Sequence, residues 1–531
     1  MKNKPIKKQP ETKKINLPHL PWTIILLCTT VVLLFSLFDP KTTLGGDNCH
    51  YMSLASSILK GSYKIEAFIG TPPEVGVTPG YPLVLATSLA LFGRTFVPVK
   101  IFSFICFISA LWLFWKLLLK AGIEKRISFL ILAFGVVNTQ IAEFSHWELT
   151  EAPFMLISAA AIIYYFKTLE KNNLVNILLT VILASAGFYI RTAGIGLPIA
   201  IGLGFLIKKR WKEFAIYTAL VALIFLPWLI RYMTIGKQVG GGIYVHQFTS
   251  DVATGVTFSL GSFISKMFRN FSRYAFVNLP SLFLPILNEK LYTSLALGYL
   301  LGGIFVLIII WGMVKSIRSK LNFYSIYIII YSLILISFSE QAAIVRYLVV
   351  VFPFIAIFLV FGTEKIFNKL DVKKAVNYAF ALVLIFVLLA IPNYIRTAKE
   401  NTNMLSEYFK GNRFAGYNIG FTRFIEANEW LKNYDSTNAG VISRKPTLTW
   451  WFSGHQSKGY KLGTPDQVKA DIDSLGAKYV IIDQIFGQTA QFLLPAVRTF
   501  PEHFNVIHAT KKPETYVLEV IKDSLINPQV Q

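Results

Sequence analysis

Charged residues and cysteines are both scarce in this chain. Only 15% of its 531 residues are charged, 29 of them acidic, and it has 3 cysteines. Cys28, Cys49 and Cys106 lack the spacing of a metal site, and two of them lie in apolar segments. Neither a zinc module nor a disulfide framework is therefore expected.

The sequence also lacks the short motifs of nucleotide and hydrolase chemistry. It contains no Walker loop, no dinucleotide fingerprint after a strand, no HExxH and no G-x-S-x-G. Nothing in the chain is built to bind a nucleotide. An enzyme that acts outside the cytoplasm would then need a substrate that is already activated there, such as a lipid-linked phosphate.

What the chain has in abundance is apolar sequence, at 54% hydrophobic residues. Runs long enough to cross a bilayer, about 20 residues each, recur between residues 22 and 394. Basic residues cluster between these runs, and such clusters mark cytoplasmic loops. The net charge of +23 therefore reflects membrane topology, and no nucleic-acid partner is expected.

With a basic cytoplasmic arm at 1–21, the pattern predicts an all-α, multi-pass protein of the cytoplasmic (inner) membrane. The transmembrane domain covers 22–394, with outer loops at 40–96, 143–150 and 234–290. Short helices near 81–93 and 255–276 are expected to lie in the outer interface. The eleven predicted spans are 22–38, 97–119, 127–142, 151–167, 173–190, 193–207, 213–233, 291–314, 321–338, 346–362 and 375–394.

The tail, 395–531, changes character. Thr464 followed by Pro465 is a strong helix start. "KYVIID" and "ETYVLEV" read as strands. These patterns predict a small soluble α/β domain on the periplasmic, or extracytoplasmic, side.

The first candidate for chemistry is an acid in the first outer loop. Asp47 follows Gly45 and Gly46, and Tyr51 comes one helical turn later. An ordinary solvated turn would explain such an acid. The functional interpretation is a general base at the membrane surface that takes a proton from a hydroxyl. Tyr51 could face the same cleft, although an isolated tyrosine there is also typical of an interfacial belt.

A second group of ionisable residues lies at 143–154. Glu148 and Glu151 are three residues apart and would share a helix face. Ionisable groups at the end of a span usually indicate function, although a solvated loop end would also explain them. His146 and Glu148 are weak candidates for a metal site, because one histidine is thin evidence.

Three arginines form the third group. Arg191, Arg231 and Arg346 all fall at the outer ends of predicted spans. Arginine is less expected on that side, and a guanidinium matches a phosphate bidentately. Contacts with lipid headgroups are the alternative explanation for each of them.

Several segments of the chain resemble GT-C glycosyltransferases, particularly the family 39-like branch of protein O-mannosyltransferases and aminoarabinose transferases. No segment is long, but their order and spacing match through most of the membrane region. They are "GGDNCHYMSLASSILKG", "TPGYPLVLATSLALFG", "TEAPF", "YIRTAGIGLP", "LPWLIRY" and "RYLVVVFP".

The resemblance assigns roles to the acids. It implies that Asp47 is the catalytic base and that Glu151, with Glu148 as a nearby rival, is the acid at the start of the fourth span. Many members of the family have a second acid beside the first, but here Asn48 follows Asp47. No cofactor is implied with certainty, and a divalent metal is left open.

The resemblance also implies a site for the lipid carrier. Tyr51 and Tyr81 in the first outer loop would contribute to it. Arg346, together with Arg191 and Arg231, would bind the lipid phosphate.

The predicted function is a membrane glycosyltransferase. It would move a sugar from a polyprenyl-phosphate donor to a hydroxyl or amine of a lipid, glycan or protein outside the cytoplasm. Inversion at the anomeric carbon needs a base and a stabilised leaving phosphate, but no protein nucleophile. The open alternatives are a transporter or flippase for lipid-linked glycans, a polymerase or ligase with a lipid-diphosphate donor, and a non-catalytic scaffold.

Overall fold

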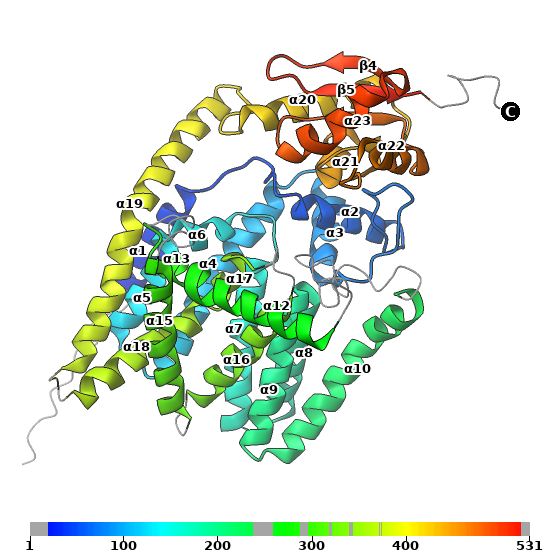
Figure 1. The fold of residues 1–531 in the computed structure, drawn as a ribbon. Coiled ribbons are helices and arrows are strands. Elements are labelled where there is room, and N and C mark those ends of the chain that lie inside the picture. Colours follow the sequence, from blue (N-terminus) through cyan, green and yellow to red (C-terminus); the bar gives the residue numbers. More distant parts are fainter. Residues whose placement is uncertain are drawn as a thin grey trace, which may run out of the picture.

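The fold consists mainly of helices, with a small sheet near the C-terminus (Figure 1). The computed structural model describes residues 20–171, 173–236, 259–286, 296–317, 321–338, 343–370, 372 and 374–521, without the side chains of 20–25.

A helix is present at each predicted span. The first outer loop adds α2 (Asp47–Leu59) and α3 (Gly80–Phe92), and the described end of the long loop adds α12 (Leu260–Arg273) and α13 (Leu279–Phe283). The helices at the predicted spans are α1 (Leu20–Phe35), α4 (Val97–Lys120), α5 (Lys125–Val137) with α6 (Thr139–Ala142), α7 (Glu151–Glu170), α8 (Leu174–Ile190), α9 (Gly196–Ile207), α10 (Trp211–Ile235), α15 (Ala296–Ser316), α16 (Asn322–Ser337), α17 (Arg346–Val349) with α18 (Phe352–Lys369), and α19 (Ala375–Phe409).

The helices differ in how well they suit a membrane crossing. Within the described segments, five are long and apolar enough by themselves, namely α4, α7, α10, α15 and α19. A bent pair, α5 with residues 139–145, would make a sixth. Several others are shorter apolar helices of 10–17 residues. The chain is a multi-pass membrane protein, and the number of eleven crossings stays a prediction.

Two helices depart from the simple reading of the apolar runs. The run at 346–362 is broken, because α17 ends at Val349 and α18 starts three residues later, at Phe352, with Pro353 in its first turn. Proline is well suited to such a start because it has no N–H to lose. The last helix, α19, continues past the apolar run to Phe409, through polar residues that favour helix. The boundary predicted at 395 thus falls inside this helix.

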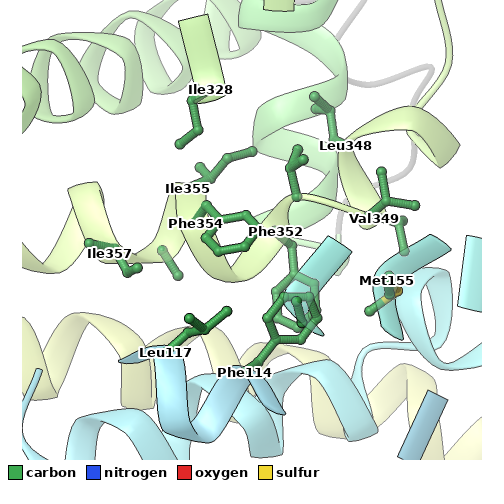
Figure 2. Packing of buried hydrophobic residues seen from close by; sticks show 14 of the residues in the cluster. Phe114, Leu117, Met155, Ile328, Leu348, Val349, Phe352, Phe354, Ile355 and Ile357 are labelled. Carbon is green, nitrogen blue, oxygen red and sulfur yellow. The ribbon is translucent and has the colours of Figure 1, made fainter. Parts of the chain in front are cut away.

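The membrane core is packed around α18, which is buried almost continuously from Phe352 to Val360. Its ring at Phe354 makes an edge contact with Phe114 of α4, with ring centroids 5.5 Å apart. Figure 2 shows these side chains together with Met155 of α7. This packing fixes α17, which immediately precedes α18.

A pair of adjacent glycines in α15 tests this close packing. A Cβ at Gly302 would overlap the carbonyl oxygen of Ala275 and lie 2.7 Å from the Cα of Phe276, whereas a Cβ at Gly303 meets nothing within 4 Å. We expect Gly302→Ala to lower the free energy of unfolding by about 1–3 kcal/mol. Gly303→Ala should be neutral or stabilise the helix by up to ~1 kcal/mol. Thermal unfolding in detergent measures both, and equal melting temperatures would contradict the packing.

The soluble domain follows α20 (Ile419–Tyr434). Its five-stranded sheet has the order β2-β1-β3-β5-β4, with β1, β2 and β3 parallel and β5 antiparallel to both β3 and β4. The strands of this sheet and the helices between them are β1 (Val441–Ile442), α21 (Pro446–Ser453), β2 (Ser457–Lys458), α22 (Pro465–Ser474), β3 (Tyr479–Ile482), α23 (Leu494–Thr499), β4 (Phe504–Ala509) and β5 (Tyr516–Val520). Thr464 caps α22 in a capping box with Gln467, and both predicted strands are present.

The soluble domain is docked on the first outer loop and lies over α2 and α3 (Figure 1). The loop extends the sheet at its β2 edge, where the amide of Ser457 donates to the carbonyl of Ala67 at 2.8 Å. At the end of α21, Arg94 donates to the carbonyls of Trp450 at 2.6 Å and Trp451 at 2.9 Å. The two parts therefore meet along a continuous interface.

Candidate active site

The first acid of the site begins a helix. Gly46 has a φ of 100°, a left-handed conformation that favours glycine, and α2 starts at the next residue, Asp47. The Asp47 side chain is 59% exposed and accepts a hydrogen bond from Nη1 of Arg346 at 2.7 Å. The turn thus presents a carboxylate to solvent beside a guanidinium that comes from α17.

The second acid, Glu151, is fully buried at the start of α7. It accepts hydrogen bonds from Nη1 of Arg191 at 2.7 Å and from Nε of Arg346. Arg191 also donates to the hydroxyl of Thr150 at 2.8 Å. Four predicted site residues from distant segments, Asp47, Arg346, Glu151 and Arg191, therefore form one chain of alternating charge, the acid–arginine cluster.

A cavity of about 550 Å³ opens in front of the acid–arginine cluster. Asp47, Tyr51, Arg191 and Arg346 line it, and Glu151 lies behind the two arginines. Further residues of the first outer loop and the start of α21 also belong to the lining. The cavity thus offers a carboxylate and two guanidinium groups to one ligand.

Tyr81 packs against one of the residues that line this cavity. Its ring is completely buried and makes an edge contact with the ring of Tyr51, with centroids 5.2 Å apart. Only Tyr51 of this pair reaches the lining of the cavity.

The rival acid, Glu148, lies outside the lining of the cavity. It is fully buried, with Oε1 3.2 Å from Nζ of Lys100 and accepting from the amide of Thr43 at 3.2 Å. The same ammonium donates to the carbonyl of His146 at 3.3 Å. Burial, together with Lys100, lowers the pKa of His146 to about 3, so this imidazole is neutral.

These contacts concern the metal site for which His146 and Glu148 were weak candidates. In the described part of the chain, no group of three or more His, Cys, Asp and Glu side chains is placed to hold a metal ion. Beside His146 and Glu148, the positive charge is supplied by Lys100.

Arg231 takes a different position from the other two arginines. Its guanidinium donates to the backbone carbonyls of Tyr63 at 2.8 Å and of Glu74 at 3.1 Å. It holds a turn of the first outer loop and does not line the cavity.

Sequence reasoning missed a histidine–glutamate pair in the cavity. His50 lies with Nε2 3.2 Å from Oε2 of Glu74, and Glu74 also accepts from the amides of Gly76 at 2.6 Å and Val77 at 3.0 Å. Burial raises the pKa of Glu74. His50 and these amides stabilise the carboxylate and lower the pKa by a larger amount, so the net pKa is below the usual range. His50 could have been found from its position three residues after Asp47, whereas Glu74 lies in a turn without periodicity.

Lys445, just before α21, was also missed, and it lines the same cavity from the soluble domain. It belongs to the segment "SRKPT", which has no periodic pattern and no recognised motif. Nothing in the local sequence links this lysine to a loop 400 residues earlier.

Comparisons with known proteins agree with this architecture. The family model described as dolichyl-phosphate-mannose-protein mannosyltransferase matches residues 76–230. A comparison with curated protein sequences finds no match. Among solved structures, ArnT from Cupriavidus metallidurans in the apo state aligns with a TM-score of 0.57 and 11% identity, covering 96% of this chain and 99% of that one.

A second structure of the same protein, bound to undecaprenyl phosphate, aligns with a TM-score of 0.54 and 10% identity, covering 95% of this chain and 99% of that one. At such low identity the likeness establishes the fold. The resemblance to the GT-C superfamily predicted from the sequence is therefore confirmed, including the small C-terminal sheet domain.

Proposed function

We propose that this chain is a membrane glycosyltransferase that moves a sugar from a polyprenyl-phosphate donor to an acceptor hydroxyl or amine on the outer side of the membrane. The observation that carries the proposal is the acid–arginine cluster at one cavity, between apolar helices and a soluble domain. A solved structure with the same fold holds undecaprenyl phosphate, and the matching family model describes a dolichyl-phosphate-mannose-dependent enzyme.

The reaction would divide between the two ends of the cluster. Asp47, the exposed acid, takes the proton from the acceptor as the acceptor oxygen or nitrogen bonds to the anomeric carbon. The bond from that carbon to the carrier phosphate breaks at the same time. Arg346 and Arg191 face the cavity and stabilise the negative charge that develops on the leaving phosphate.

Glu151 would act as a positioning residue. It is buried, contacts both guanidinium groups and does not line the cavity. A buried carboxylate that holds two arginines in place keeps both guanidinium groups at the cavity before the substrate arrives, which lowers the cost of reorganisation during the reaction. In this scheme no protein nucleophile is needed, and the anomeric configuration inverts.

The proposal is tested by comparing envelope glycans and glycoproteins by mass spectrometry. The samples are a strain without this chain and the same strain with the wild-type chain restored. We expect the deletion to remove one defined sugar from one acceptor while the sugar-charged monophosphate carrier accumulates on the outer side.

Three other results would overturn the proposal. Unchanged glycans at normal expression of the restored chain would favour a scaffold. Accumulation of a lipid-linked glycan on the cytoplasmic side would indicate a transporter. Loss of a long glycan, with a diphosphate carrier left charged, would indicate a polymerase or ligase.

A further inference from the structure

The soluble domain contributes a basic side chain, Lys445, to the lining of the candidate active site, beside Pro446 and Thr447. Lys445 lies directly before α21, is half-buried and lines the cavity together with Asp47. Its Nζ donates to the backbone carbonyl of Gly45 at 3.1 Å and lies 5.1 Å from the centre of the Phe486 ring. The ammonium is thus held at the rim of the cavity from two sides.

The charge of Lys445 is not matched by a carboxylate in direct contact. The cavity lining contains three Lys and Arg side chains, Arg191, Arg346 and Lys445. Both arginines form ion pairs with Glu151 or Asp47. Among the residues that the structure describes, Lys445 has no carboxylate within ion-pair distance and is held by a neutral carbonyl and a ring.

This environment favours an incoming anion. Burial lowers the pKa of Lys445, which the more distant charge of Asp47 partly offsets. A partly desolvated ammonium has lost hydrogen bonds to water, and without a charged partner this loss of hydration free energy is not fully compensated. A phosphate oxygen in the cavity would supply that partner, because an ammonium binds phosphate as a compact point charge.

The position of Lys445 depends on how the soluble domain is docked. Two residues later, the hydroxyl of Thr447 donates to the carbonyl of Gly46 at 3.0 Å, so the start of α21 is fastened to the turn that precedes Asp47. At the opposite end of α21, Arg94 holds the carbonyls of Trp450 and Trp451. These contacts place the lysine and the turn before the proposed base in one rigid arrangement.

We propose that Lys445 binds the phosphate of the lipid carrier, so that the soluble domain supplies part of the carrier site and the site is complete only when this domain is docked. The inference rests on the proposed function and deepens it. It assigns to the C-terminal domain a direct role in holding the donor and the leaving phosphate.

The test measures the affinity of the purified full chain, in lipid nanodiscs, for undecaprenyl phosphate and for undecaprenol, which lacks the phosphate. We expect Lys445→Ala to weaken binding of undecaprenyl phosphate by roughly tenfold or more, because the free energy of a hydrogen bond to a charged group corresponds to an affinity change of about that factor. Binding of undecaprenol should not change. Lys445→Arg keeps the positive charge and should restore most of the lost affinity.

Two control variants separate phosphate contact from other effects. Arg94→Ala weakens domain docking at the far end of α21, outside the cavity lining. Lys458→Ala removes an exposed positive charge from β2 of the same domain. Lys458→Ala should bind undecaprenyl phosphate as the wild type does. Arg94→Ala leaves Lys445 and its contact with Gly45 in place, so it should weaken binding clearly less than Lys445→Ala does.

The outcomes distinguish this inference from the proposed function. If the wild type does not prefer undecaprenyl phosphate over undecaprenol, the proposed function fails. If the wild type prefers the phosphate and Lys445→Ala binds it equally well, the assignment of Lys445 is wrong while the proposed function stands. Equal losses in Lys445→Ala and Arg94→Ala would also overturn the assignment, because domain docking alone would then explain the effect.

Discussion

Replacing Asp47 with asparagine is expected to lower the rate of sugar transfer by roughly 10²–10⁴-fold, the usual contribution of a general base. Asparagine has nearly the same shape and can still accept a hydrogen bond from Arg346, but it cannot take a proton from the acceptor. The Asp47 side chain is 59% exposed, so its ion pair contributes about 0–1 kcal/mol to stability. The variant should therefore insert and fold normally.

The measurement is the initial rate of transfer from a labelled polyprenyl-phosphate sugar, with melting temperature and carrier affinity recorded for the same preparation. A matched control is Asp39→Asn. Asp39 is also an acid near the start of the first outer loop and pairs with a basic residue, Lys41, at 2.8 Å, but it lies outside the cavity lining. The control should keep the wild-type rate. Transfer by Asp47→Asn at the wild-type rate would remove Asp47 as the base.

Replacing Glu151 with glutamine should instead affect stability. The carboxylate is fully buried between the guanidinium groups of Arg191 and Arg346. Neutralising it leaves the buried guanidinium of Arg191 without its carboxylate partner, beside the positive charge of the partly buried Arg346. Breaking a buried ion pair in this way costs about 3–5 kcal/mol. We expect a large fall in melting temperature and a much lower yield of folded protein.

The same helix provides the control for this prediction. Glu170, at the other end of α7, is 64% exposed and pairs with Lys120. Glu170→Gln should change the free energy of unfolding by less than about 1 kcal/mol. Thermal unfolding in detergent compares the two variants. Equal melting temperatures would mean that Glu151 does not hold the two arginines together.

Much of the helical fold could be predicted from the sequence, because a span needs only local information. Apolar length and flanking basic residues placed a helix at every expected position, and the Thr464 cap located α22. The break between α17 and α18 was missed, although Pro353 in the motif "RYLVVVFP" carried the signal. The residue before a proline disfavours helical geometry, but the continuous apolar run concealed this.

The sequence predicted at which end of a helix each candidate side chain lies, but not which neighbour the side chain would point toward. Arg191, Arg231 and Arg346 were all expected at the outer ends of spans. Arg191 and Arg346 meet at Glu151, whereas the guanidinium of Arg231 is turned to backbone carbonyls of the first outer loop. The rotation of a helix about its axis depends on packing with helices far away in the sequence, which apolar length does not report. Lys445 could not be predicted either, because its place at the cavity depends on how the soluble domain packs on a loop 400 residues earlier.

The long sequence separations within the site also have a consequence in time. Asp47 contacts Arg346 across 299 residues, and Lys445 reaches the turn at Gly45 across 400 residues. At a synthesis rate of about 5–20 residues per second, roughly 15 seconds to a minute pass between the translation of Asp47 and that of Arg346. A chain still being inserted thus exposes its acid without the arginine or the lysine. The candidate site can therefore assemble only after nearly the whole protein has left the ribosome. A chain that terminates early is left with an incomplete site.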